Sequence, residues 1–319
     1  MRPNRARRIV GVVVSLVAVG GCDVWASRQQ APHFPTSAGG WAALGAAVLV
    51  YAAATVVRGW RWHMILRHAQ IRHRAVDAYG LTVVGYMGNT VLPARGGELL
   101  RIFLMSERSS GRRREILGAI LPERLLDAAA LAALFVVLTA AGTGGAPLGA
   151  APAYLAAGAL IAGVAGLLVY LRLRVAGRMQ GFADRLRPVL RASRTLLTAT
   201  GAMLAAVSIG IWISEAVVFW LVAGSVDVSL SLLDALLVVV LASFLALVPS
   251  APGYLGTYDA ALLFGLDSLS VNGGTALSVA LMFRFVVFVP ITFAGLGLMV
   301  ARYGGLRAAQ SSEATAAHA

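Results

Sequence analysis

Lysine is absent from this 319-residue chain, so all 27 of its basic residues are arginine. The chain therefore has neither the phosphate-binding lysine of a P-loop nor a lysine that could hold pyridoxal phosphate. This absence argues against ATP-driven transport by the chain alone, and we expect no cofactor. Cysteine is almost absent too. Cys22 stands alone, which excludes an intrachain disulfide.

Charged residues are also scarce, at 13%, whereas hydrophobic residues make up 59% and the mean hydropathy is +0.78. This composition is typical of a polytopic membrane protein. No polar linker divides the chain, so we expect one all-α transmembrane domain over residues 1–319. Its membrane region should cover about 9–301, and 302–319 should form a disordered cytoplasmic tail. The net charge of +13 lies in short arginine runs between apolar segments. That pattern indicates topology signals beside anionic lipid, not nucleic-acid binding.

The arginine runs mark the segments that we expect in the cytoplasm of a multi-pass plasma-membrane protein. They predict about six full transmembrane helices with both termini cytoplasmic. The six predicted spans are residues 9–25, 40–57, 116–141, 153–171, 196–224 and 275–301. One run follows the second span: Arg58, Arg61, Arg67, Arg72 and Arg74. Trp60 and Trp62 within it suit a helix that lies at the membrane interface.

Two apolar stretches do not fit full crossings. Residues 78–106 have basic clusters on both sides, so both of their ends should be cytoplasmic. The first arm, 78–91, would be about 21 Å long as a helix, short of the ~30 Å hydrocarbon core. It predicts a re-entrant hairpin with its tip at 92–97. Residues 232–267, broken at 249–258, predict a second re-entrant hairpin that opens from the outside. Such a pair is an inverted-repeat-like arrangement.

The tips of the two predicted hairpins use similar residues. Residues 93–98 read Pro-Ala-Arg-Gly-Gly-Glu, and residues 252–259 read Pro-Gly-Tyr-Leu-Gly-Thr-Tyr-Asp. Glu98 lies 26 residues before Arg124, and Asp259 lies 25 residues before Arg284. Ionisable groups inside apolar segments cost at least ~2.5 kcal/mol each, which makes them functional candidates.

These motifs resemble the transmembrane, flippase-like domain of the lysylphosphatidylglycerol synthases over roughly residues 8–303. The resemblance rests on Asn89-x-x-Leu92-Pro93-x-Arg95-x-Gly97-Glu98-x-x-Arg101, Glu123-Arg124-x-x-Asp127, Pro252-Gly253-x-x-Gly256 and Arg284. This chain has Asp259 where the family usually has glutamate. Only residues 302–319 follow the last predicted span. The resemblance therefore implies a stand-alone member without the soluble aminoacyl-transfer domain, and hence no synthase activity.

What the resemblance implies is translocation of a polar or charged (phospho)lipid between leaflets. The arginine fork binds phosphate in a bidentate manner, and carboxylates would balance it or hold a cationic head group. The expected partner is a membrane phospholipid or other polar lipid, with a separate lipid-modifying enzyme as a possible second one. The candidate head-group and translocation residues are Asn89, Pro93, Arg95, Gly97, Glu98, Arg101, Glu123, Arg124, Asp127, Pro252, Gly253, Gly256, Asp259 and Arg284.

Two other interpretations stay open. The arginines and carboxylates could only form buried ion pairs that lock helix packing, as the i,i+4 pair Glu123 and Asp127 suggests; Glu215 is open in the same way. Alternatively, the chain could be a membrane-embedded enzyme, or an accessory subunit, for lipid or isoprenoid-linked glycan or hopanoid synthesis. No catalytic constellation favours an enzyme. His63, His68 and His73 are five residues apart, which scatters them around a helix axis, and we expect no metal site.

Overall fold

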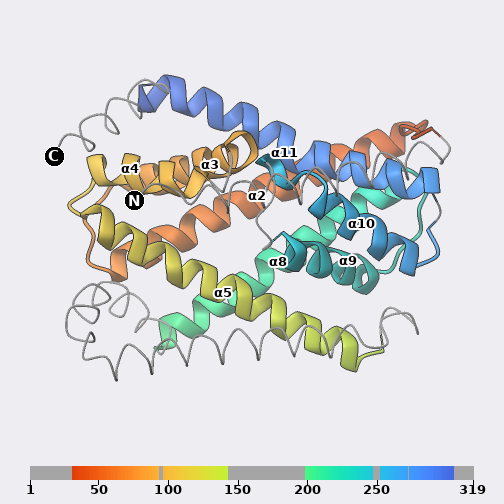
Figure 1. Cartoon of the computed structure of the whole chain (residues 1–319), viewed down its shortest axis with the longest axis horizontal. Coiled ribbons are helices and arrows are strands. Elements are labelled where there is room, and N and C mark those ends of the chain that lie inside the picture. Colours follow the sequence, from red (N-terminus) through yellow and green to blue (C-terminus); the bar gives the residue numbers. More distant parts are fainter. Residues whose placement is uncertain (1–30, 93–95, 143–197, 247–251, 272, 305–319) are drawn as a thin grey trace, which may run out of the picture.

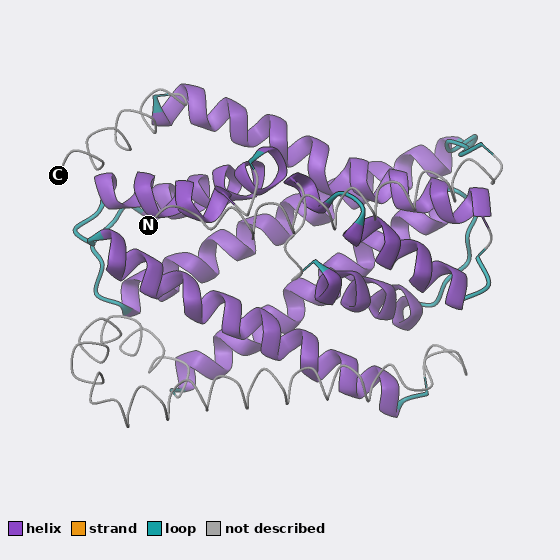
Figure 2. Ribbon diagram, in the orientation of Figure 1, coloured by secondary structure: helices purple, strands orange, loops and turns teal. Residues whose placement is uncertain are grey.

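The structure, a computed structural model, describes residues 31–92, 96–142, 198–246, 252–271 and 273–304. Within these ranges the chain forms helices and connecting loops and no strand (Figure 2). The elements are α2 (Ala38–His68), α3 (Ala75–Val91), α4 (Gly96–Arg108), α5 (Arg113–Ala140), α8 (Ala199–Ser225), α9 (Leu232–Leu245), the short 3₁₀ helix η4 (Pro252–Tyr254), α10 (Thr257–Ser268) and α11 (Gly273–Tyr303). The prediction of an all-α fold is confirmed for this part of the chain.

Three of these helices, α2, α8 and α11, are long and apolar enough to cross a membrane. Their 27 to 31 residues correspond to about 40–46 Å, more than the ~30 Å hydrocarbon core. The span predicted at 116–141 forms α5, which has 28 residues but carries charged groups in its first half. The spans predicted at 9–25 and 153–171 lie outside the described residues.

Helix α2 corrects one prediction. The helix does not end near Val57 but runs unbroken to His68, and the segment predicted to lie at the interface is part of it. Trp62, Arg58 and Arg61 are all buried. They are therefore not groups at the membrane surface. The face of α2 that bears Trp62 and Ile65 packs against α3. This packing buries the part of α2 that follows its apolar stretch.

Both broken segments form helical hairpins, which open at opposite ends of the molecule (Figure 1). In the first hairpin α3 and α4 lie side by side, joined through residues 92–95. In the second hairpin α9 and α10 pack together, with η4 near the tip. The tips point towards the middle of the body. The first break was predicted at 92–97, and it lies between the end of α3 at Val91 and the start of α4 at Gly96. The second was predicted at 249–258, but α9 already ends at Leu245 and α10 begins at Thr257.

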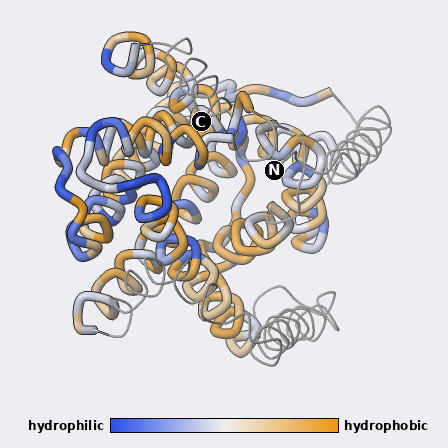
Figure 3. The backbone as a smooth tube through the Cα atoms, turned by 60° about the vertical axis from the view of Figure 1, so that its left-hand side comes forward, coloured by the Kyte–Doolittle hydropathy of each residue, from blue (hydrophilic) through white to orange (hydrophobic). Residues whose placement is uncertain are grey.

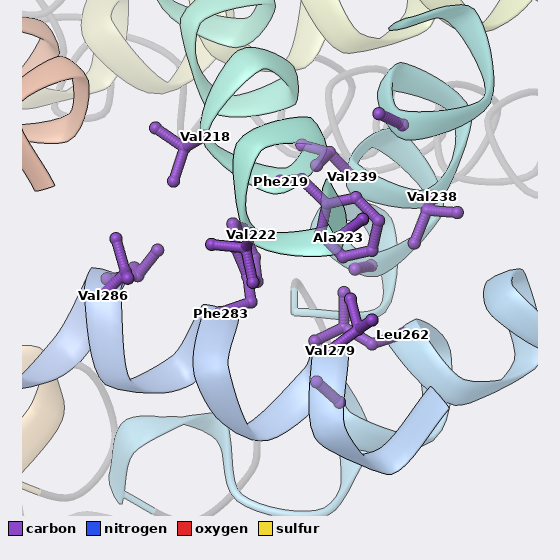
Figure 4. Packing of buried hydrophobic residues seen from close by; sticks show 14 of the residues in the cluster. Val218, Phe219, Val222, Ala223, Val238, Val239, Leu262, Val279, Phe283 and Val286 are labelled. Atoms are coloured by element: carbon purple, nitrogen blue, oxygen red, sulfur yellow. The ribbon is translucent and has the colours of Figure 1, made fainter. Parts of the chain in front are cut away.

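Each hairpin has its own hydrophobic core, and α2 and α11 contribute to both. One cluster joins the second hairpin to α2, α8 and α11. In it, Phe219 of α8 meets Phe283 of α11 edge to face at 5.0 Å (Figure 4). A second cluster joins the first hairpin to α2, α5 and the end of α11. The two long helices therefore hold the hairpins in fixed positions.

The two ends of the helical body differ in charge. At one end, called here the arginine-rich end, lie the loops around Arg72–Arg74 and Arg108–Arg113 and the last turn of α11. Hydrophilic stretches gather at one end in Figure 3. At the opposite end, the described connecting segments 31–37, 226–231 and 269–271 contain no arginine. This asymmetry places the two hairpin openings in different electrostatic surroundings.

Candidate functional site

The tip of the first hairpin is built on close backbone approach. The Gly97 amide donates a hydrogen bond to Asn89 Oδ1 at 3.1 Å, which ties the start of α4 to the end of α3. A Cβ on Gly97 would collide with the backbone oxygen of Gly85, so only glycine fits. This contact sets the position of Glu98 in the first turn of α4. Pro93 and Arg95 lie outside the described residues.

Gly97→Ala should therefore destabilise the protein, since the new methyl group meets backbone atoms that cannot move aside without separating α3 from α4. We expect a loss of roughly 1–3 kcal/mol, the usual cost of overpacking. The control is Gly45→Ala in α2, where a Cβ would meet no atom within 4 Å. That change should be neutral or slightly stabilising. The thermal midpoint of each detergent-purified variant measures both. Equal midpoints for Gly97→Ala and wild type would contradict this account of the tip.

A charged layer lies below that tip, between α2, α4 and α5. Arg101 of α4 donates two hydrogen bonds to the carboxylate of Glu123 on α5, at 2.8 and 3.2 Å. Its guanidinium carbon also lies 4.0 Å from the centre of the Trp62 ring. Arg101 and Glu123 are both buried. Both partners are thus sealed from solvent in a bidentate pair.

Arg61 of α2 completes the sealed part of this layer. It donates to the two carboxylate oxygens of Asp127 at 2.6 and 3.2 Å and to Ser208 Oγ at 2.6 Å. Glu123 lies 3.8 Å away. The Arg61 side chain is 0% exposed. It therefore links three helices, α2, α5 and α8, through one guanidinium group.

Arg124 is held more loosely in the same layer. Its nitrogens lie 3.1 Å from Glu98 and 3.7 Å from both Glu123 and Asp127. Within the described ranges none of these contacts has hydrogen-bond geometry. The Arg124 side chain is 31% exposed and that of Glu98 is 25% exposed. The Glu98–Arg124 pair is thus the accessible part of the layer.

The tip of the second hairpin carries the matching pair. Gly253 and Gly256 adopt φ angles of 66° and 85°, which glycine allows and most residues avoid. They turn the chain so that Asp259 Oδ2 accepts the Gly256 amide at 2.9 Å. Arg284 of α11 donates to Asp259 at 2.8 Å and to the Gly253 carbonyl at 2.9 Å. The two side chains of this pair are 20% and 17% exposed.

The two tips touch each other. Helix η4, which begins at Pro252, packs against α3. A Cβ on Gly253 would lie 3.5 Å from the Thr90 carbonyl oxygen and 3.5 Å from Arg284 Nη2. The chain thus brings two hairpins from opposite ends to one meeting point, with an arginine–carboxylate pair beside each tip.

A further ion pair joins α2 to α8. Arg58 donates to Glu215, and both side chains are buried. The rings of Tyr51 and Tyr86 lie 5.8 and 5.7 Å from the Arg58 guanidinium carbon. Glu215, which the sequence left without a partner, therefore has one. Arg58 lies one turn of α2 from Arg61, so the two arginines share one face of that helix.

Sequence reasoning missed Arg58, Arg61 and Trp62 as interior residues because they follow an apolar segment and belong to an arginine run. Their spacing of three and four residues was the available signal, since it places them on one helix face.

Two of the histidines contact each other: His63 and His73 share a hydrogen bond of 2.8 Å. Over the described ranges, no group of three His, Cys, Asp or Glu residues could hold a metal ion.

The layer and the neighbouring α2–α8 pair together contain four arginines and four carboxylates. They are Arg58, Arg61, Arg101 and Arg124, and Glu98, Glu123, Asp127 and Glu215. Among the described residues, the four positive and four negative groups balance, so this part of the layer is electrically neutral. A phosphate could enter only by taking the place of a carboxylate on an arginine. The loosely held pair beside the first hairpin allows such an exchange at the lowest cost, because Arg124 donates no hydrogen bond to the residues that the structure describes.

Apolar helices of spanning length around a layer of interior ion pairs define a polytopic helical membrane protein. The family model for the lysylphosphatidylglycerol synthase TM region matches residues 7–295, nearly the whole chain, and the chain belongs to that family.

Among curated proteins, the chain is 26% identical over 150 residues to the glycosyltransferase AglD of Haloferax volcanii. The alignment covers 46% of this chain and 24% of AglD, so the chain spans about a quarter of that relative's length. No solved structure gave a significant match.

Proposed function

We propose that this protein translocates a polar or charged (phospho)lipid between the leaflets of a membrane. The observation that carries the proposal is the pair of partly exposed arginine–carboxylate contacts, Glu98–Arg124 and Asp259–Arg284, one beside the tip of each hairpin. Family membership supports the proposal, because the family is named for the transmembrane region of synthases of a charged phospholipid.

Exposure separates the roles of the charged residues. Arg61, Arg101 and Glu123 are sealed from solvent, and each lies in an ion pair with a neighbouring helix, which suits a structural role in holding α2, α4 and α5 together. Arg124 and Arg284 retain exposed surface. A guanidinium group that is exposed and only partly engaged can accept two phosphate oxygens without leaving a buried carboxylate unpaired. In our proposal, these two arginines contact the lipid head group, while the partner carboxylates Glu98 and Asp259 take a cationic group of the lipid or a proton.

We also propose that both hairpins are re-entrant. Helices α3, α4, α9 and α10 have 17, 13, 14 and 12 residues, or about 26, 20, 21 and 18 Å. Each is shorter than the ~30 Å hydrocarbon core. The described part of the second break, η4, packs against α3. Irregular backbone at that depth is tolerated only where it is buried in protein or lines a water-filled cavity. Helices that stop midway and meet there offer a polar path while the lipid tails stay outside.

We further propose that the protein acts in the plasma membrane, with the arginine-rich end facing the cytoplasm as the positive-inside rule predicts. Reporter fusions at residue 304 and within the 226–231 segment measure this. A cytoplasm-active fluorescent fusion should work at residue 304, and an externally active enzyme fusion should work in 226–231. The reverse result would overturn the orientation.

Leaflet exchange in reconstituted vesicles tests the proposed function directly. Phosphatidylcholine vesicles would carry a trace of fluorescently labelled phosphatidylglycerol or phosphatidylethanolamine, quenched from outside by a membrane-impermeant reductant. The protein should allow loss of the inner-leaflet signal, whereas Glu98→Gln should not. If vesicles with the protein protect the same fraction of label from the reductant as empty vesicles do, for every labelled lipid, then translocation of those lipids is excluded.

The alternative, an accessory subunit or enzyme for lipid-linked glycan synthesis, draws on the similarity to AglD, a protein named as a glycosyltransferase. The alignment reaches only 24% of that protein, so its activity does not carry over on this ground. An enzyme would form product in detergent, where leaflets do not exist, and that assay separates the two functions.

A further inference from the structure

A cavity of about 330 Å³ lies at the arginine-rich end, away from the charged layer between the hairpins. Four residues from three helix ends line it: Arg74 before α3, Asp77 in its first turn, Arg108 at the end of α4 and Arg302 at the end of α11. Three cations and one carboxylate give the lining a net charge of +2. Nothing in the proposed lipid path uses these residues.

The carboxylate in this lining is already engaged. Asp77 is buried, and its Oδ1 accepts hydrogen bonds from Arg302 Nε at 3.2 Å and from Arg302 Nη2 at 3.1 Å. Asp77 therefore neutralises Arg302 and fixes its position. The charge that is left over on the lining belongs to Arg74 and Arg108.

Arg108 is positioned without a close carboxylate. Its guanidinium carbon lies 4.8 Å from the centre of the Tyr303 ring, and its Nη2 donates to the Arg302 carbonyl at 3.3 Å. The nearest carboxylate, Glu107, is 3.9 Å away and is not part of the lining. The aromatic ring and the backbone contact thus hold Arg108 at the cavity.

The helix dipole does not explain Arg74. Arginines at the ends of α4 and α11 are favoured by the helix dipole, which accounts for Arg108 and Arg302. Arg74, however, precedes α3 at its N-cap, where a cation opposes the dipole, and no side chain caps that helix. Among the described residues Arg74 makes no ion pair. An anion in the cavity would pair with Arg74 beside a helix N-terminus that has no side-chain cap.

We propose that this cavity binds a phosphate group, held by Arg74 and Arg108 and oriented by the Asp77–Arg302 pair. Guanidinium forks bind phosphate in a bidentate manner, and a helix N-terminus favours an anion. The net charge of +2 on the lining suits a phosphate monoester, which carries close to two negative charges at neutral pH. The phosphate belongs either to a lipid head group or to a soluble phosphate compound. The proposal does not depend on translocation, because no residue of the cavity contacts the layer that contains Arg124.

The test uses the full chain and two probes. Inorganic phosphate is titrated calorimetrically into protein in an uncharged detergent, and phosphatidic acid in phosphatidylcholine nanodiscs is followed by native mass spectrometry. Arg74→Gln and Arg108→Gln should each weaken binding about tenfold or more, the effect of losing a charged hydrogen bond. Arg114→Gln, an exposed arginine of α5 outside the cavity, removes the same charge and should change nothing.

Binding of inorganic phosphate with this pattern of variants would support a soluble ligand, and binding of phosphatidic acid alone would support a lipid. Absence of binding by both probes would overturn the proposal. So would equal weakening by Arg114→Gln, which would mean a diffuse charge effect. Arg74 is exposed at the start of α3, so Arg74→Gln should fold. If Arg108→Gln does not fold, phosphate binding by Arg74→Gln alone tests the proposal.

Discussion

Glu123→Gln should unfold or strongly destabilise this protein. Glu123 is fully buried and carries the charge that balances Arg101, and it lies 3.8 Å from Arg61. A neutral glutamine leaves these two buried guanidinium groups with too little negative charge. Breaking a buried pair by removing one partner costs about 3–5 kcal/mol. The thermal midpoint in detergent should fall sharply, and expression should fall with it.

The matched control is Glu115→Gln, in the same helix. Glu115 pairs with the exposed Arg112, and glutamine can still accept the Arg112 amide that Glu115 accepts at 2.9 Å. Surface pairs contribute about 0–1 kcal/mol, so its midpoint should stay close to that of wild type. If Glu123→Gln were as stable as Glu115→Gln, the buried layer would not hold the helices together, and the division between sealed and accessible arginines would fail.

Arg124→Gln should give the opposite result: a folded protein that no longer moves lipid. Arg124 makes no hydrogen bond within the described ranges and is partly exposed, so its loss should cost little stability. If it contacts the phosphate of the lipid, leaflet exchange should slow about tenfold or more. Arg124→Lys keeps the charge but not the bidentate fork, and should fall between the two. Arg114→Gln, in the same helix, should exchange lipid as wild type does.

A charge reversal separates substrate contact from ion pairing. In the double variant Glu98→Arg with Arg124→Glu, the pair between α4 and α5 is kept but its polarity is exchanged. Stability close to that of wild type together with lost exchange would support contact between Arg124 and the head group. Exchange at the wild-type rate in Arg124→Gln, or in the double variant, would remove Arg124 from the lipid path.

The sequence predicted breaks close to their observed positions, and it marked the charged residues beside them. At the second tip Gly253 and Gly256 adopt positive φ angles, and at the first tip Gly97 allows the close contact between α3 and α4. The similar spacings from Glu98 to Arg124 and from Asp259 to Arg284 end in ion-pair distances of 3.1 and 2.8 Å. The breaks follow from the local chemistry of proline and glycine, whereas pairing across 25 or 26 residues depends on how the helices pack.

The partners of Arg58 and Arg61 could not be read in the same way. An arginine run after an apolar segment is the usual signature of a cytoplasmic flank, and nothing local distinguishes a buried arginine from an exposed one. Their carboxylates, Glu215 and Asp127, lie 157 and 66 residues further along the chain. Pairing over such separations is set by which helix faces meet, and the sequence alone does not state this.

By itself, then, the sequence determined that the chain is helical and apolar, where its helices break, and which charges lie beside the breaks. These are properties of short segments, fixed by composition, periodicity and backbone chemistry. Only the tertiary structure decided which charges are sealed and which stay accessible. Burial depends on α2, α5 and α8 closing around Arg61 while leaving Arg124 at an edge. Accessibility is a property of the packed helices together, so it appears only when the helices have been brought into contact.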